Sequence, residues 1–197
     1  MATTCDKLLA ANIAPDCTNP QVAGVEADGI IINRADIDFD SCVKDETNPN
    51  IIKTLALKSG KKGFSIYQQG NSPFTGTNTA FSAGTYTNKF VKQVNFVVFD
   101  HSADCSHNII DQLANGSFVV ILKNKYRGSD SKSKFEVYGY EAGLKQSEGT
   151  REAYSEDTDG GWSIAMQETA PTSGIFLYNT DLTTTESMVE SLLTAAS

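Results

Sequence analysis

Hydrophobic and polar positions alternate along much of the chain, and the pattern predicts strands grouped around one short helix. Residues 86–100 give the longest strand signal, residues 117–122 are apolar at nearly every position, and residues 134–146 alternate again. Alternation with period two is typical of a strand with one buried face, whereas a short continuous apolar run fits a strand buried on both faces. The order strand, helix, strand, hairpin, strand therefore predicts a largely antiparallel sheet with one attached helix.

A helix is expected between the first two of these strands, over residues 102–114. Ser102 is a suitable N-cap, and Asp104 in the first turn interacts favourably with the positive end of the helix dipole. Apolar residues recur at helical spacing up to Leu113, and Asn115-Gly116 is a typical C-terminal stop.

Shorter elements are expected on either side of this region. Residues 29–33 and 63–69 predict strands, residues 51–58 a strand or a short helix, and residues 183–194 a C-terminal helix. Residues 34–40 alternate apolar and acidic side chains, which predicts a solvated strand edge or arm with Asp36, Asp38 and Asp40 on one face. The carboxylates fit a solvent-facing row better than a metal site, because the glycine and closing glutamate of a calcium loop are missing.

Residues 70–85 carry the weakest structural signal, since glycine, asparagine, serine, threonine and proline dominate them. A loop this long inside a compact domain is usually functional or disordered. Phe74 and Phe81 are its isolated apolar residues. Two interpretations stay open: an arm whose phenylalanines contact a neighbouring copy, or a mobile surface loop.

These elements predict a mainly β (α+β) fold, an antiparallel β-sandwich or half-barrel with one flanking helix, a long loop or arm and a C-terminal helix. One domain over residues 1–197 is expected. Residues 1–60 would form an arm and the first strands, residues 61–180 the sandwich with its helix, and residues 181–197 the C-terminal helix and tail.

Composition narrows the functional classes. The formal charge of −8 leaves little basic surface for gripping phosphates, which argues against a nucleic-acid-binding protein. The same acidity suits a surface that nucleic acid passes without sticking, or an ordinary acidic protein. No apolar run approaches the length needed to cross a bilayer, and the N-terminus lacks the pattern of a secretory signal, so synthesis and folding in a cytoplasm are expected.

The one dense basic stretch, residues 123–134, lies between two predicted strands. It is either a solvated hairpin tip or a contact surface for an acidic partner, such as a neighbouring copy. Its basic residues are candidate subunit contacts: Lys123, Lys125, Arg127, Lys132 and Lys134.

No constellation of reactive residues points to an enzyme, a metal or a cofactor. His101, Cys105 and His107 are close in sequence, but helical spacing sends Cys105 and His107 to different faces. A hydrolase using Asp100 or His101 would need a nucleophile, a base and an orienting group, and no such set is visible. Cys5, Cys17, Cys42 and Cys105 show no C-x-x-C spacing and are expected to be free thiols in a reducing compartment, with a bridge among Cys5, Cys17 and Cys42 as the alternative.

The element order, ending in residues 135–144 (FEVYGYEAGL) and 157–162 (DTDGGW), resembles the tail tube (major tail) protein family of tailed phages. The resemblance covers about residues 86–178. It lies in the order of the predicted elements and in short local stretches of sequence. Residues 1–60 have no match in it.

This resemblance implies a virion structural protein with a β-sandwich or half-barrel fold. Six copies would form a ring, rings would stack through loops and terminal arms, and DNA and tape-measure protein would pass through the lumen without specific binding. Other tail proteins, such as the terminator and the baseplate or tip, would be partners, and the protein would reside in the virion tail after synthesis in the host cytoplasm. Two alternatives stay open: a capsid-associated or head-to-tail connector protein, and a carbohydrate-binding β-sandwich using Trp162 and the tyrosines.

Overall fold

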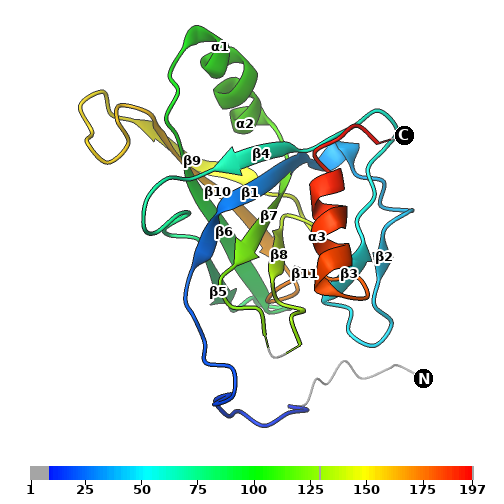
Figure 1. The fold of residues 1–197 in the computed structure, drawn as a ribbon. Helices are drawn as coiled ribbons and strands as arrows, with labels where there is room; N and C mark the ends of the chain where they lie inside the picture. The colour runs from blue at the N-terminus through cyan, green and yellow to red at the C-terminus, as the bar shows by residue number, and fades with distance from the viewer. Residues whose placement is uncertain (1–8, 129, 197) are drawn as a thin grey trace.

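The chain folds into two packed β-sheets with a helix on the outside of the larger one (Figure 1). The computed structural model describes residues 9–128 and 130–196. The larger sheet has seven strands in the order β2-β3-β11-β8-β7-β1-β4, and the smaller has four in the order β5-β6-β10-β9. All neighbouring strands are antiparallel except β11 and β3, which run parallel. The predicted mainly β sandwich with a C-terminal helix is confirmed.

The elements have the following bounds. The large sheet contains β1 (Val25–Asn33), β2 (Val43–Lys44), β3 (Ile51–Thr54), β4 (Phe64–Tyr67), β7 (Phe118–Asn124), β8 (Phe135–Tyr138) and β11 (Phe176–Leu177). The small sheet contains β5 (Asn78–Ser82), β6 (Lys89–Val98), β9 (Lys145–Arg151) and β10 (Trp162–Ala170). The helical elements are η1 (Arg34–Asp36), α1 (Ala103–Cys105), η2 (Ser106–Ile110), α2 (Asp111–Asn115) and α3 (Leu182–Ser191).

Strand β7 explains why residues 117–122 are apolar throughout. Val119 and Ile121 face a core shared with α3, while Val120 and Leu122 face a second core between the two sheets. Successive side chains of a strand point to opposite faces, so a strand with a covered layer on each side must be apolar on both.

The predicted helix is present but is not regular. Ser102 caps it, since its hydroxyl accepts a hydrogen bond from the Cys105 N–H, and α1 and α2 are joined by the π-helical turn η2. Figure 1 shows this helix projecting from one end of the molecule. Ile110 and Leu113 anchor it to the core between the sheets.

Residues 134–146, expected to be one strand, form two strands in different sheets. β8 belongs to the large sheet and β9 to the small one, and a turn between them carries the chain across. Gly139 and Gly143 hold positive φ angles of 85° and 83° in this turn, a conformation that favours glycine. The predicted bend at these glycines is a complete change of sheet.

Two other expectations are wrong. Residues 34–40 are not a strand edge: η1 and a turn replace it, and the Ile37 side chain is buried in the core with α3. Residues 70–85 are not a structureless loop, because residues 78–82 form β5 and pair with β6. The alternation in residues 34–40 also occurs in turns that pack against a sheet. The polar composition of residues 70–85 does not exclude a short edge strand.

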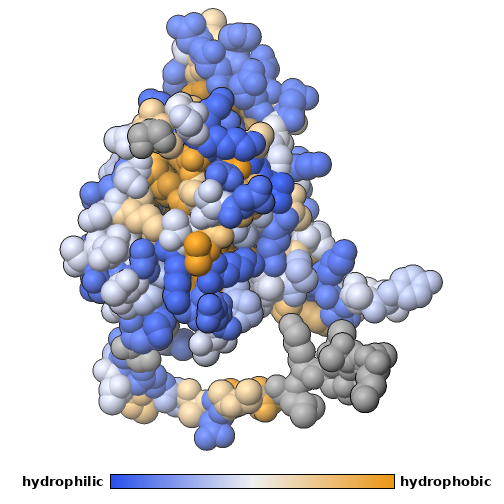
Figure 2. All heavy atoms as spheres, turned by 90° about the vertical axis from the view of Figure 1, so that its right-hand side faces the viewer, coloured by the Kyte–Doolittle hydropathy of each residue, from blue (hydrophilic) through white to orange (hydrophobic). Residues whose placement is uncertain are grey.

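Residues 9–24 form an arm that precedes β1 and contains bends at residues 11, 17–19 and 24. Figure 1 shows it leaving the body at the end opposite α1 and α2, and Figure 2 shows open space between the arm and the body. In the described part of the chain, no helix is long and apolar enough to span a membrane.

Candidate assembly surface

The outer face of the four-stranded sheet is broad and nearly uncharged. Ladder partners in an antiparallel sheet share a face, and the buried Val94, Phe96, Ile164 and Met166 define the inner one. The register then places the following fifteen side chains on the outer face: Asn78, Ala80, Ser82, Lys89, Val91, Gln93, Asn95, Val97, Lys145, Glu148, Thr150, Ser163, Ala165, Gln167 and Thr169.

Only Lys89, Lys145 and Glu148 are charged on this face, which gives it a net charge of +1 in a chain of −8. Most of the other side chains are small or neutral and polar. The acidic excess therefore lies on other parts of the molecule.

Both outer strands of this sheet have one unpaired edge in the described structure. β5 pairs only with β6, and β9 pairs only with β10. Natural edge strands are commonly protected by charged residues, prolines or bulges. β9 carries Lys145, Glu148 and Arg151, but the five residues of β5 contain no charge and no proline. The β5 edge is therefore open to pairing with another strand.

The two phenylalanines proposed as subunit contacts lie in different environments. Phe81 is 61% exposed on β5 and packs edge-on against Phe90, with ring centroids 5.9 Å apart. Phe74 is only 3% exposed and belongs to the core between the sheets. Phe74 is therefore unavailable to a neighbouring copy, because its own chain buries it.

The basic residues of the β7–β8 connection also differ. Lys134 is 3% exposed, donates a hydrogen bond of 2.8 Å to the Asn124 carbonyl and lies 3.6 Å from Glu26, so it is a buried structural residue and not a surface contact. Burial lowers the pKa of its ammonium group below the ordinary lysine value.

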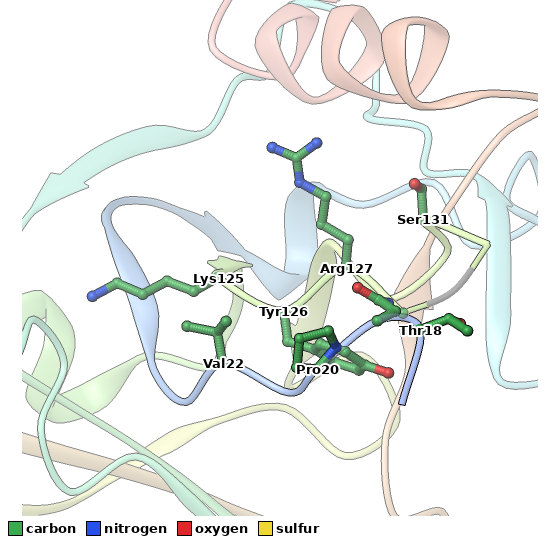
Figure 3. Close-up of a pocket in the computed structure, with 9 residues that line it drawn as sticks. Thr18, Pro20, Val22, Lys125, Tyr126, Arg127 and Ser131 are labelled. Carbon is green, nitrogen blue, oxygen red and sulfur yellow. The ribbon is translucent and has the colours of Figure 1, made fainter. Parts of the chain in front are cut away.

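The remaining four basic residues reach the surface. Lys123 pairs with Glu186 of α3 at 3.7 Å, and Lys132 with Asp130 at 3.0 Å. Lys125 and Arg127 are exposed, and Figure 3 shows their side chains pointing in different directions. Part of the basic charge is thus neutralised within the chain.

A shallow polar pocket of about 480 Å³ separates this connection from the base of the N-terminal arm (Figure 3). Thr18, Pro20 and Val22 line one side, and Tyr126 and Arg127 the other. The Lys125 N–H donates a 3.0 Å hydrogen bond to the Gly24 carbonyl. These contacts fix where the arm leaves the body.

An ionic cluster is buried between the sheets. Lys92 is 1% exposed, and its Nζ lies 3.5 Å from both Glu168 Oε1 and Glu141 Oε2. Glu168 accepts hydrogen bonds from the Gly139 and Ala142 N–H groups, and Glu141 accepts one from Thr172. None of these three residues was among the candidate site residues, although Lys92 and Glu168 both fall on inward positions of alternating strands.

The contacts of the cluster are those of a structural tie. Its carboxylates accept hydrogen bonds from backbone and hydroxyl donors of their own chain. Through Glu168 the cluster connects the turn between β8 and β9 to strand β10 of the small sheet. No group of three or more potential metal ligands occurs in residues 9–128 and 130–196.

The residues considered for metal binding in the sequence lie in different environments. Cys105 is buried and its thiol donates a hydrogen bond to the Asp100 carbonyl, while His101 and His107 are exposed. Burial raises the pKa of the Cys105 thiol, which keeps it protonated. Cys17, Cys42 and Cys105 are free thiols, and Cys5 lies outside the described residues.

Comparisons with protein-family models, with curated proteins and with solved structures found no match to this chain.

Proposed function

We propose that this protein is a self-assembling virion protein, the subunit of a phage tail tube in which hexameric rings stack around a lumen. The observation that carries the proposal is the four-stranded sheet, whose outer face is nearly neutral and whose two edges have no partner strand among residues 9–128 and 130–196. The resemblance in element order over residues 86–178 agrees with it.

Ring closure follows from the two edges. A sheet edge offers a row of free N–H and C=O groups that pair readily with another strand. If β5 of one copy pairs with β9 of the next, each copy uses two different surfaces, and such heterologous contacts close into a ring when the rotation between copies allows it. The joined small sheets would then form one continuous inner wall.

The outer face of the small sheet suits that wall. A conduit for DNA must avoid basic clusters, because each phosphate contact with lysine or arginine adds affinity and slows passage. Here the face presents mainly serine, threonine, asparagine, glutamine and alanine, with two lysines offset in part by Glu148. DNA and a tape-measure protein could pass such a surface without specific binding.

The remaining surfaces would serve other contacts. The seven-stranded sheet and α3 would face outward, and other tail proteins would meet the ends of the tube. This role requires no catalytic group, cofactor or metal.

Negative-stain electron microscopy of the purified protein at high concentration tests the proposal. We expect rings or tubes for the natural chain. Ala80→Lys, which adds a charge to the exposed β5 edge strand, should abolish them, whereas Ser163→Lys adds the same charge in the central strand β10 and should leave rings intact. A chain that stays monomeric at high concentration contradicts the proposal, and copurification with heads instead of tails would favour a connector.

A further inference from the structure

Lys92 carries an ammonium group whose hydrogen-bonding capacity is unused. The side chain is 1% exposed, and its Nζ lies 3.5 Å from Glu168 Oε1 and 3.5 Å from Glu141 Oε2. No acceptor in residues 9–128 and 130–196 forms a hydrogen bond with this Nζ. An ammonium group has three donors, and burying them without acceptors is costly. An ion pair alone therefore does not account for this arrangement.

The amine and a carboxyl group are placed as the reactants of an amide condensation. Lys92 on β6 and Glu168 on β10 are register partners in neighbouring strands, so the sheet holds the two side chains beside each other. Groups held together in this way react as if at very high concentration, with effective molarities of about 10⁵–10⁸ M. Burial adds to this effect, because condensation replaces two buried charges with a neutral amide.

Glu168 has the environment of an electrophile. Its side chain is fully buried, Oε1 accepts a 2.8 Å hydrogen bond from the Gly139 N–H, and Oε2 accepts a 3.1 Å hydrogen bond from the Ala142 N–H. Backbone donors in such positions stabilise the negative charge that develops on an oxygen when a nucleophile attacks the carboxyl carbon. The oxygen that stays after condensation keeps its backbone donor as the amide carbonyl.

Glu141 has the position of a proton carrier. Its Oε2 lies 3.5 Å from the Lys92 Nζ and accepts a 2.7 Å hydrogen bond from the Thr172 hydroxyl, which orients the carboxylate. Its side chain is 15% exposed whereas that of Glu168 is fully buried, so Glu141 is the carboxylate of the cluster that contacts solvent. A positioned carboxylate that accepts and returns protons accelerates a reaction by about 10²–10⁴-fold.

We propose that Lys92 and Glu168 condense to an isopeptide bond, a modification that makes the tie between β6 and β10 covalent. The Lys92 ammonium group passes a proton to Glu141, and the neutral amine attacks the Glu168 Cδ. The Nζ–Cδ bond forms, one Cδ–Oε bond breaks, and Glu141 delivers the two protons taken from Nζ to the departing oxygen. One water leaves, Glu141 ends as the carboxylate that it was, and no oxidant or second reactant is consumed.

This bond lies in the interior of one chain. It depends neither on the proposed tube nor on contacts between copies, so its failure and the failure of the tube are distinguishable. Unfolding measurements do not separate an ion pair from an amide, because Lys92→Met removes both. The mass of the chain separates them, since the amide lacks one water.

Mass spectrometry of the natural full-length chain, held folded at neutral pH for several days, tests the proposal. We expect an intact mass about 18 Da below that of the unmodified sequence, the mass of one water. Tryptic digestion should yield a branched peptide that joins the segments around Lys92 and Glu168, with no cleavage after Lys92. An unchanged mass would overturn the proposal. A water lost elsewhere would also overturn it, for example in a succinimide at Asp159 or in an amide between Lys53 and Asp45, an exposed pair 2.9 Å apart.

Two matched variants test the role of Glu141. Glu141→Gln keeps the amine and Glu168 but cannot carry the protons, so the bond should form about a hundredfold more slowly or less. Glu148→Gln makes the same change on the exposed face of β9, outside the cluster, and should leave the rate unchanged. Equal rates in these two variants would overturn the role of Glu141, and a loss of water at Glu168 in Lys92→Met would overturn the bond. The mass of the natural chain decides the proposal even if Glu141→Gln fails to fold.

Discussion

Lys92 on β6 and Glu168 on β10 are direct partners across the small sheet, and the Lys92 Nζ lies 3.5 Å from the Glu168 Oε1 in the layer between the two sheets. A buried ion pair contributes little net stability when intact, but removing one partner leaves an uncompensated charge. Glu168 also holds the Gly139 and Ala142 N–H groups. The pair therefore ties the turn that changes sheets to the sheet it enters.

We expect Glu168→Gln to lower the free energy of unfolding by about 3 kcal/mol, the range found for breaking a buried pair. The double variant Lys92→Met with Glu168→Gln should recover part of this loss, because the buried ammonium group, which has only Glu141 as a partner in the single variant, is gone. Urea unfolding of the two single variants and the double variant measures the coupling. Additive effects would show that the two charges do not interact.

The turn itself gives a second prediction. A Cβ added to Gly139 would collide with the backbone carbonyl of Phe118, whereas a Cβ on Gly60 would meet open space. Both glycines have positive φ angles, 85° and 74°, so Ala at either site bears the same conformational cost of about 1–2 kcal/mol. We expect Gly139→Ala to be more destabilising than Gly60→Ala by about 2 kcal/mol or more, as for other overpacked sites, measured by urea unfolding. An equal loss of unfolding free energy in the two variants would mean that the backbone around Phe118 shifts to accommodate the added Cβ at little cost.

These residues illustrate what sequence pattern can predict. The apolar run of β7 and the capped helix after Ser102 were predictable, because burial on both faces and capping chemistry each leave a local signature. The change of sheet between β8 and β9 was not, since alternation with period two continues through the turn and does not say which sheet a strand joins. Gly139 and Gly143 were the residues in the sequence that indicated a turn at this point.

The candidate surface was predictable only in part. Phe81 and the exposed basic residues could be selected from the sequence, but the burial of Phe74 and Lys134 depends on contacts distant in the chain. The neutral outer face of the small sheet becomes visible only once the register of four strands is known. Residues from four separate segments form it, so no single stretch of sequence shows it.

The C-terminal helix gives a prediction about pH. Asp181 caps α3, because its Oδ1 accepts a 2.7 Å hydrogen bond from the Thr184 N–H. This hydrogen bond and the one from the Thr184 hydroxyl hold the pKa of Asp181 below its ordinary value. A depressed folded-state pKa contributes stability that is fully present above the unfolded-state value of 3.8 and is lost as pH falls through the folded-state value.

Asp181→Ala should therefore lower the Tm by about 2–4 °C at pH 7, as expected for the loss of a cap in a chain of this size. The difference between the variant and the natural chain should shrink below the folded-state pKa, where the natural carboxyl group is also protonated. Calorimetry across pH 2–7 measures it, and Asp16→Ala is a control, since Asp16 lies in the arm and caps no helix. A difference in Tm that does not change with pH would show that the carboxylate charge is not involved.

The proposed lumen gives the last prediction, which concerns nucleic acid. Gln167 lies on the outer face of β10, and Gln167→Lys adds one positive charge per copy to the wall around the channel. Ser187→Lys adds the same charge to the exposed side of α3, on the opposite side of the large sheet. We expect tubes of the Gln167 variant to retain short DNA with an affinity that falls steeply with salt, because repeated charges on a closed wall act together on the phosphates. Tubes of the natural chain and of the Ser187 variant should retain little, as measured by cosedimentation at two salt concentrations. If both variants bind DNA equally, the outer face of the small sheet does not line the channel; if the Ser187 variant binds more tightly, the assignment of inner and outer surfaces must be reversed.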